Sequence, residues 1–128
     1  MNVLVIALDA VGPTDLRDAE VLVVAPALNS RLRHWLSDED GARRRAAERA
    51  DACVEQLERS GAHASGRVGD PDPMQAIEDA LPTFPADEVV IAAESEQVAE
   101  RARKRFALPV LEARRLRPDS RAGPKRSS

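Results

Sequence analysis

Three short runs of aliphatic residues constrain the fold of this chain more than any other feature of its sequence. They cover residues 2–8, 20–25 and 88–92, and each is nearly continuous in Val, Leu, Ile and Ala. Such runs are typical of strands that are buried on both faces of a parallel sheet. Weaker strand patterns lie at 62–68 and 109–112. The sequence therefore predicts five strands.

Helical patterns lie between these strands. The longest spans 38–60, and its small or aliphatic residues recur at helical spacing: Ala42, Ala46, Ala50, Cys53, Val54 and Leu57. Ser37 with Asp40 resembles a capping box at its start, and Gly61 suits a left-handed cap at its end. A second helix opens at Asp72-Pro73 and ends near Pro82, and a third runs from 95 to about 106. A two-turn helix at 13–19 is expected to connect the first two strands.

Alternation of strands and helices predicts an α/β fold, a doubly wound and mostly parallel sheet with helices on both faces. Right-handed crossovers leave few topologies, and the commonest five-stranded one has the order 3-2-1-4-5. The 128 residues suit one domain, which we assign to 1–113. Residues 114–128 are rich in Arg, Ser and Pro, and we expect them to form a disordered basic tail.

Composition excludes several classes of site. Cys53 is the only cysteine and the chain has two histidines, so no intrachain disulfide can form and no metal-ligand spacing is visible. No run approaches the ~20 apolar residues needed to span a bilayer, and the first eight residues lack a signal-peptide pattern. We therefore expect a cytoplasmic protein without membrane contact. The tail carries six basic side chains and one acidic one, whereas the whole chain has a net charge of −3. Residues 1–113 are therefore acidic, and because an acidic surface repels nucleic acid, we do not expect nucleic acid binding.

In an open parallel sheet, ligands bind beyond the carboxyl ends of the strands, where the strand order reverses. For the predicted order this crevice lies between the first and fourth strands. The residues that follow the strands at this end are Asp9, Asn29, Ser30, Gly69, Asp70 and Glu94. Some of these residues also have a plain structural interpretation: Asp9 fits a turn, and Gly69 to Asp72 fit a strand-to-helix turn with a helix cap. No catalytic nucleophile, base or metal ligand is predicted.

Two surfaces are candidates for contact with another chain. The segment 28–36 contains Arg31 and Trp35, residue types that often anchor interfaces, although the same segment could pack as a lid on its own domain. The last strand, which includes Val110, is expected at the edge of the sheet.

Several of these residues also resemble a known family. The run 68–80 (VGDPDPMQAIEDA) followed by 86–91 (ADEVVI) is similar to the third strand, third helix and fourth strand of universal stress proteins. Asp9 at the end of VLVIALD resembles that family's acidic residue after the first strand, and 109–111 (PVL) resembles its last strand. The resemblance covers about 2–112. It implies a fold of the adenine nucleotide alpha hydrolase-like group, frequent homodimers and roles in stress physiology, usually without known catalysis.

The family members that bind ATP carry a glycine-rich motif after the fourth strand, and this sequence departs from it. No glycine occurs between Gly69 and Gly123, and Glu94 and Glu96 lie where the phosphates would bind. Carboxylates repel phosphate, and residues with a Cβ keep the backbone from approaching it closely. We expect a non-catalytic regulatory or stress-response module that binds no cofactor and acts on an unidentified protein partner. The alternatives are a nucleotide-binding sensor or weak hydrolase that uses the crevice, and an oligomeric scaffold.

Overall fold

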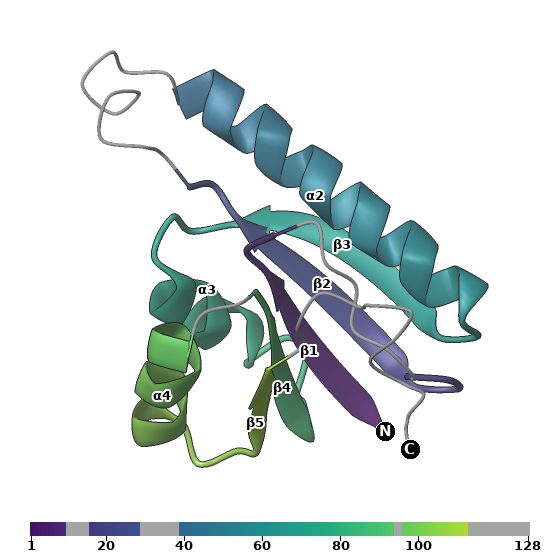
Figure 1. Cartoon of the computed structure of the whole chain (residues 1–128). Helices are drawn as coiled ribbons and strands as arrows, with labels where there is room; N and C mark the ends of the chain where they lie inside the picture. The colour runs from purple at the N-terminus through teal and green to yellow at the C-terminus, as the bar shows by residue number, and fades with distance from the viewer. Residues whose placement is uncertain (10–15, 29–38, 94–95, 113–128) are drawn as a thin grey trace, which may run out of the picture.

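The computed structural model describes residues 1–9, 16–28, 39–93 and 96–112, which contain a single sheet of five parallel strands (Figure 1). The strands are β1 (Asn2–Ala7), β2 (Glu20–Pro26), β3 (His63–Gly69), β4 (Glu88–Ala92) and β5 (Val110–Glu112). Their order in the sheet is β3-β2-β1-β4-β5, with every neighbouring pair parallel. The predicted order is therefore confirmed, and the sheet is parallel throughout.

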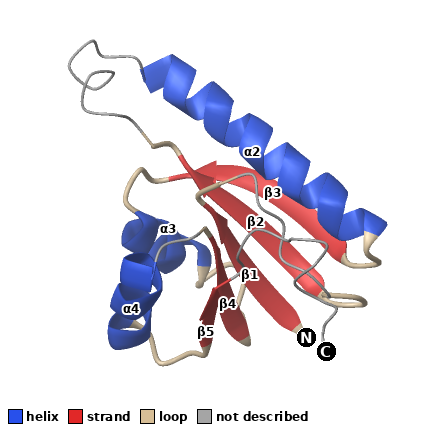
Figure 2. Ribbon diagram, in the orientation of Figure 1, coloured by secondary structure: helices blue, strands red, loops and turns tan. Residues whose placement is uncertain are grey.

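Three helices in the described residues cover the two faces of this sheet (Figure 2). The long helix α2 (Glu39–Arg59) lies on one face, whereas α3 (Pro73–Ala80) and α4 (Glu96–Arg105) lie together on the other. An ion pair between Glu78 of α3 and Arg105 of α4 links these two helices. The doubly wound α/β architecture predicted from the sequence is thus present.

The central strands are buried on both faces, and alternate residues face the two helical layers. In β1, Val3, Val5 and Ala7 belong to the apolar cluster beneath α2. Leu4 and Ile6 belong to the cluster beneath α3 and α4. All five side chains are fully buried. This two-sided burial explains why the sequence of β1 lacks the polar alternation of a half-exposed strand.

Small side chains allow the helices to approach the sheet closely. In α2 the residues that face the sheet are almost all small, and those of α4 are alanines: Ala42, Ala46, Ala50, Cys53 and Leu57 in α2, with Ala99 and Ala102 in α4. The sulfur-bearing Cys53 lies within this packed layer, and burial raises the pKa of its thiol to about 11. The thiol therefore stays protonated at neutral pH and serves the core.

Two predicted helix ends are confirmed. Asp72 has extended backbone angles and its side chain accepts a hydrogen bond from the amide of Met74, 3.0 Å away, as expected of a helix N-cap. Gly61 follows α2 with a φ of 98°, a left-handed conformation that glycine adopts without steric cost. The surface pair between Glu55 and Arg59 is also present, at 3.2 Å.

The predicted helix at 13–19 is wrong over its described part, because residues 16–19 form a tight turn. The amide of Ala19 donates to the carbonyl of Leu16 at 3.0 Å, and Asp18 has a φ of 66°. The amide of Asp18 donates to the carbonyl of Gly61 instead of to a helical partner. This contact aligns the starts of β2 and β3, and it uses the backbone groups that a helix would need. Residues 13–15 lie outside the described part of the chain.

Within the described ranges, no helix combines the length and the apolar character that crossing a membrane requires.

Candidate functional site

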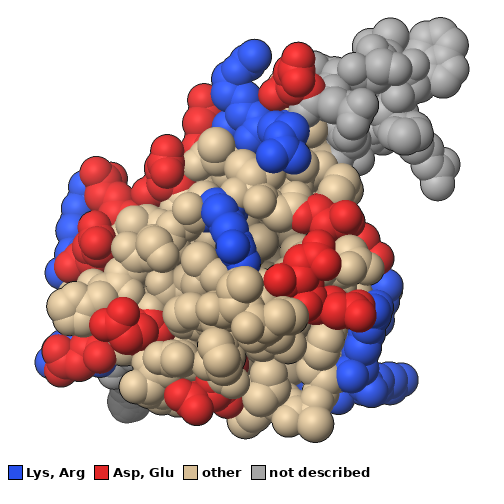
Figure 3. Space-filling model, turned by 180° about the vertical axis from the view of Figure 1, so that it is seen from behind, with Lys and Arg blue, Asp and Glu red and all other residues tan. Residues whose placement is uncertain are grey.

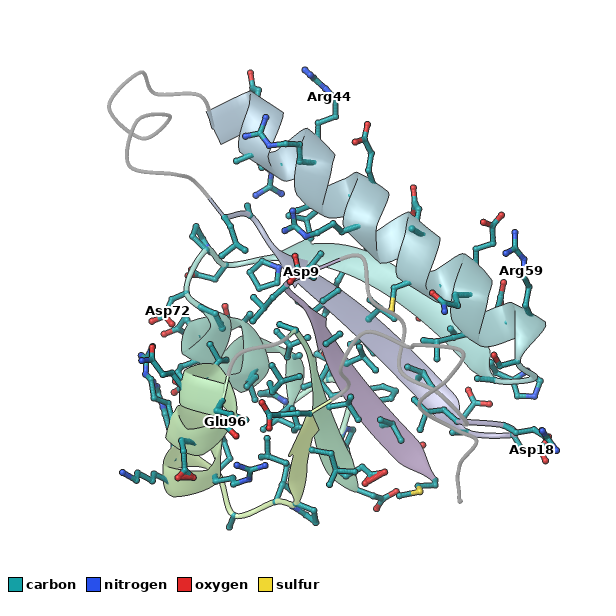
Figure 4. The ribbon with its side chains drawn as sticks, viewed as in Figure 1. Asp9, Asp18, Arg44, Arg59, Asp72 and Glu96 are labelled. Atoms are coloured by element: carbon teal, nitrogen blue, oxygen red, sulfur yellow. The ribbon has the colours of Figure 1, made fainter. Side chains whose placement is uncertain are left out.

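The carboxyl ends of the strands form the end of the sheet where the sequence predicts a binding crevice. Asp9, at the end of β1, lies at this end, as do Asp72 and Glu96 at the starts of α3 and α4, whereas Asp18 lies at the opposite end (Figure 4). The strand order reverses between β1 and β4, because β2 lies on one side of β1 and β4 on the other. The described part of the predicted crevice therefore comprises Asp9, Ala92, Ala93 and the start of α4.

Backbone hydrogen bonding closes this point of the sheet. The amide of Asp9 donates to the carbonyl of Ala92 at 3.1 Å, which extends the pairing of β1 with β4 past the last strand residue. Ala92 and Ala93 are almost completely buried. An amide that is already bonded within the sheet cannot also bind a phosphate oxygen, so the Asp9 amide is not available to an anion. The side chain of Asp9 is exposed.

A long side chain from α2 occupies the carboxyl ends of the two strands beside this point. Arg49 donates from Nε to the carbonyl of Ala7 at 3.3 Å, and from Nη2 to the carbonyl of Pro26. One guanidinium therefore satisfies the last carbonyl groups of both β1 and β2. Carbonyl oxygens at the end of a parallel sheet need a donor once side chains exclude water from them, and the planar fork of arginine can serve two at once.

The electrostatics of Arg49 reflect this position. Partial burial lowers the pKa of its guanidinium below the ordinary value, the carboxylate of Asp9 acts in the opposite direction, and the positive charge of Arg45 lowers it further. Arginine remains protonated at every physiological pH, so the lowered pKa indicates a desolvated cation rather than a neutral one. Asp9 therefore contributes to the charge balance around Arg49.

Sequence reasoning did not identify Arg49. It lies in an arginine-rich stretch of α2, RRRAAER, and nothing in that pattern separates it from its exposed neighbours. The available signal is positional: Arg49 precedes the buried Ala50 and follows the buried Ala46 by three residues, so it borders the face that packs on the sheet.

The start of α4 is acidic. Glu96 is the first residue of the helix and its side chain is exposed. A carboxylate in the first turn interacts favourably with the positive end of the helix dipole, and it repels any phosphate that approaches the same amides. The predicted site residue Glu94 lies outside the described residues.

The turn between β3 and α3 is built by close packing and by its own hydrogen bonds. A Cβ at Gly69 would lie 2.5 Å from Cγ1 of Val24, so only glycine allows this approach without a shift. Asp70 accepts a hydrogen bond from the amide of Asp72 at 2.9 Å. These contacts agree with the structural interpretation of Gly69 and Asp70. Since β3 and β1 are separated by β2, the two residues lie roughly 10 Å from Asp9, at two strand spacings.

The remaining candidate residues fall into two groups. Asn29, Ser30, Arg31 and Trp35 lie outside the described residues. Val110 was predicted at an interface, but the structure places its side chain in the core beneath α3 and α4, with 5% of its surface exposed. The adjacent Leu111 points to the other face and is 49% exposed. Strand alternation gives one residue to the core and the next to the surface, and the sequence of this short strand did not show which was which.

A metal centre has no support in the described ranges, where no group of three or more His, Cys, Asp or Glu side chains is arranged to hold an ion. No protein-family model matches the chain, and no curated protein matches it either. The fold is consistent with that of nucleotide alpha hydrolase-like proteins, which is a statement about the sheet order and not about activity.

Proposed function

We propose that this chain is a non-catalytic regulatory module of the universal stress protein type that does not bind nucleoside triphosphate. It acts by contact with a partner in the cytoplasm, and it needs no cofactor. The observation that carries this proposal is the acidic, glycine-free start of α4, with Glu96 in its first turn and no glycine between Gly69 and Gly123. A triphosphate site at this fold position requires backbone amides that the phosphates can approach closely.

Further support comes from the arrangement at the end of β1. The amide of Asp9 donates to the carbonyl of Ala92, and two N–H groups of Arg49 donate to the carbonyls of Ala7 and Pro26. Both groups belong to the internal hydrogen bonding of the sheet. The segment that resembles universal stress proteins coincides with β3, the Asp72 cap, α3 and β4, so the resemblance extends over consecutive elements of one fold.

A thermal-shift measurement with ATP, ADP and AMP, each with and without Mg²⁺, tests this proposal. Ligand binding to the native state must raise the melting temperature, so the expected result is no shift with millimolar ATP or ADP. A rise of several degrees with ATP would refute it. The alternative, a nucleotide-binding sensor or weak hydrolase that uses the strand ends, predicts such a rise and its loss in Asp9→Ala.

The proposal includes a homodimer. Among the described strands β5 is an edge strand whose single neighbour is β4, and Leu111 on it is half exposed. An exposed edge with an apolar side chain is suited to pairing with a second copy. The sequence offers a second candidate contact in Trp35 and Arg31, which lie outside the described residues. Light scattering should give a dimer that Leu111→Glu converts to a monomer, while Trp35→Ala tests the second surface. A wild-type monomer at high micromolar concentration would contradict the homodimer.

A further inference from the structure

A cavity of about 490 Å³ lies at the opposite edge of the sheet from β5, beside the edge strand β3. Its lining comes from four parts of the fold. Val24 of β2 and Ala76 of α3 contribute apolar surface, Arg67 comes from β3, and Arg43 comes from α2. This volume is in the range of small-molecule sites, which measure roughly 300–1,000 Å³. The site is separate from the point between β1 and β4.

The two arginines of this cavity, Arg43 and Arg67, lie in the same lining as Asp70 and Asp79 but are not ion-paired with any described carboxylate. Arg67 makes one long contact, 3.5 Å from Nη2 to the hydroxyl oxygen of Thr83, which also lines the cavity. The Thr83 hydroxyl donates its own proton to the carbonyl of Ala80 at 3.2 Å, so the two guanidinium groups are the donors that this cavity offers to a phosphate group.

The two acidic residues of the cavity are already engaged through one oxygen each. Oδ1 of Asp70 accepts from the amide of Asp72, and Oδ1 of Asp79 accepts from the side chain of Gln75 at 2.8 Å. Each carboxylate keeps a second oxygen that can accept from a hydroxyl group. Their negative charge also disfavours a ligand with several phosphates, because it offsets the charge of the two arginines.

The helix N-terminus adds nothing to this argument, because Asp72 already caps α3. The cavity therefore offers cations for one anionic group, acceptors for hydroxyl groups and an apolar floor for a carbon skeleton. We propose that this cavity binds the phosphate monoester of a polyol, as in a sugar phosphate, with the phosphate on Arg43 and Arg67. This goes beyond the proposed function and can fail independently of it, since it uses none of the residues near Asp9.

Ribose 5-phosphate and glucose 6-phosphate are the probes, with ribose, inorganic phosphate and ATP measured in parallel. At a hundredfold excess over its dissociation constant, a sugar phosphate should raise the melting temperature by about 5 °C or more. Ribose and inorganic phosphate should produce clearly smaller shifts, because each supplies only half of the ligand. In an amide NMR titration the largest changes should fall at Gly69, Asp70 and Ala76.

The variants Arg43→Gln and Arg67→Gln locate the phosphate contact. Each should weaken sugar phosphate binding about tenfold or more, because a charge-assisted hydrogen bond is lost. Arg44→Gln is the matched control, since Arg44 is an exposed neighbour on α2 that points away from the sheet (Figure 4). Absence of a shift with both sugar phosphates would overturn the inference. So would an equal response to inorganic phosphate alone, or an equal loss of binding in Arg44→Gln.

Discussion

Replacement of Arg49 by methionine tests how the carboxyl end of the sheet is stabilised. The Arg49→Met variant keeps most of the aliphatic stem of the side chain and removes both hydrogen bonds to the strand carbonyls. A hydrogen bond to a charged group contributes roughly 1.5–3 kcal/mol, so the two bonds set an upper limit of about 3–6 kcal/mol. The desolvation that lowers the pKa of Arg49 opposes this gain. We therefore expect a loss of about 2–3 kcal/mol in the free energy of unfolding.

Two further variants make this measurement specific. Arg49→Lys keeps the charge but has a single ammonium group that cannot reach both carbonyls, so it should lose about half as much, roughly 1–1.5 kcal/mol. Arg44→Met changes an exposed arginine of the same helix and should stay within about 0.5 kcal/mol of the wild type.

Urea denaturation followed by circular dichroism is the assay, and an unchanged slope of free energy against urea would show that the same surface is exposed on unfolding. If Arg49→Met unfolds at the same urea concentration as Arg44→Met, the bonds to Ala7 and Pro26 contribute nothing, and the role assigned to Arg49 is refuted.

Three other predictions concern single positions. Gly61→Ala should cost about 1–2 kcal/mol in urea denaturation, because Gly61 has a φ of 98° and the new Cβ would lie 3.0 Å from Cγ of Arg17; an unchanged midpoint would contradict this. Asp72→Ala should lower the free energy of unfolding by about 1 kcal/mol, because the hydrogen bond from the Met74 amide is lost, whereas Asp72→Ser should keep most of this stabilisation. Cys53 should resist thiol reagents in the native state. Because its folded pKa is about 11 and the ordinary value is 9.0, the unfolded state releases its proton first, so stability should fall as pH rises from about 9 to about 11; rapid native labelling at pH 8 would contradict this.

The sheet order was predictable because its central strands have no polar face. Burial on both sides requires continuous aliphatic sequence, and β1, β2 and β4 show it clearly. The edge strand β3 (HASGRVG) is mostly exposed, so its sequence carries a weaker pattern. Its position was still predictable, because right-handed crossovers restrict where a strand after α2 can pair.

The features that sequence reasoning missed depend on contacts between distant segments. Arg49 bonds to residues 42 and 23 positions away, and no local pattern reports such a contact. The turn at 16–19 is tied by the Asp18 amide to the carbonyl of Gly61, which follows α2. The cavity at β3 requires Arg43 and Arg67 from separate elements. On the face seen in Figure 3, basic and acidic side chains are interspersed around uncharged residues. The distribution of charge on this face therefore does not single out a binding surface.

The central claim is that the junction between β1 and β4 holds no triphosphate, and direct binding of ATP measures it. Isothermal titration of the full chain with ATP and Mg²⁺ should show no saturable heat up to millimolar ligand. A dissociation constant in the micromolar range, together with amide NMR changes at Asp9, Ala92 and Glu96, would contradict the account.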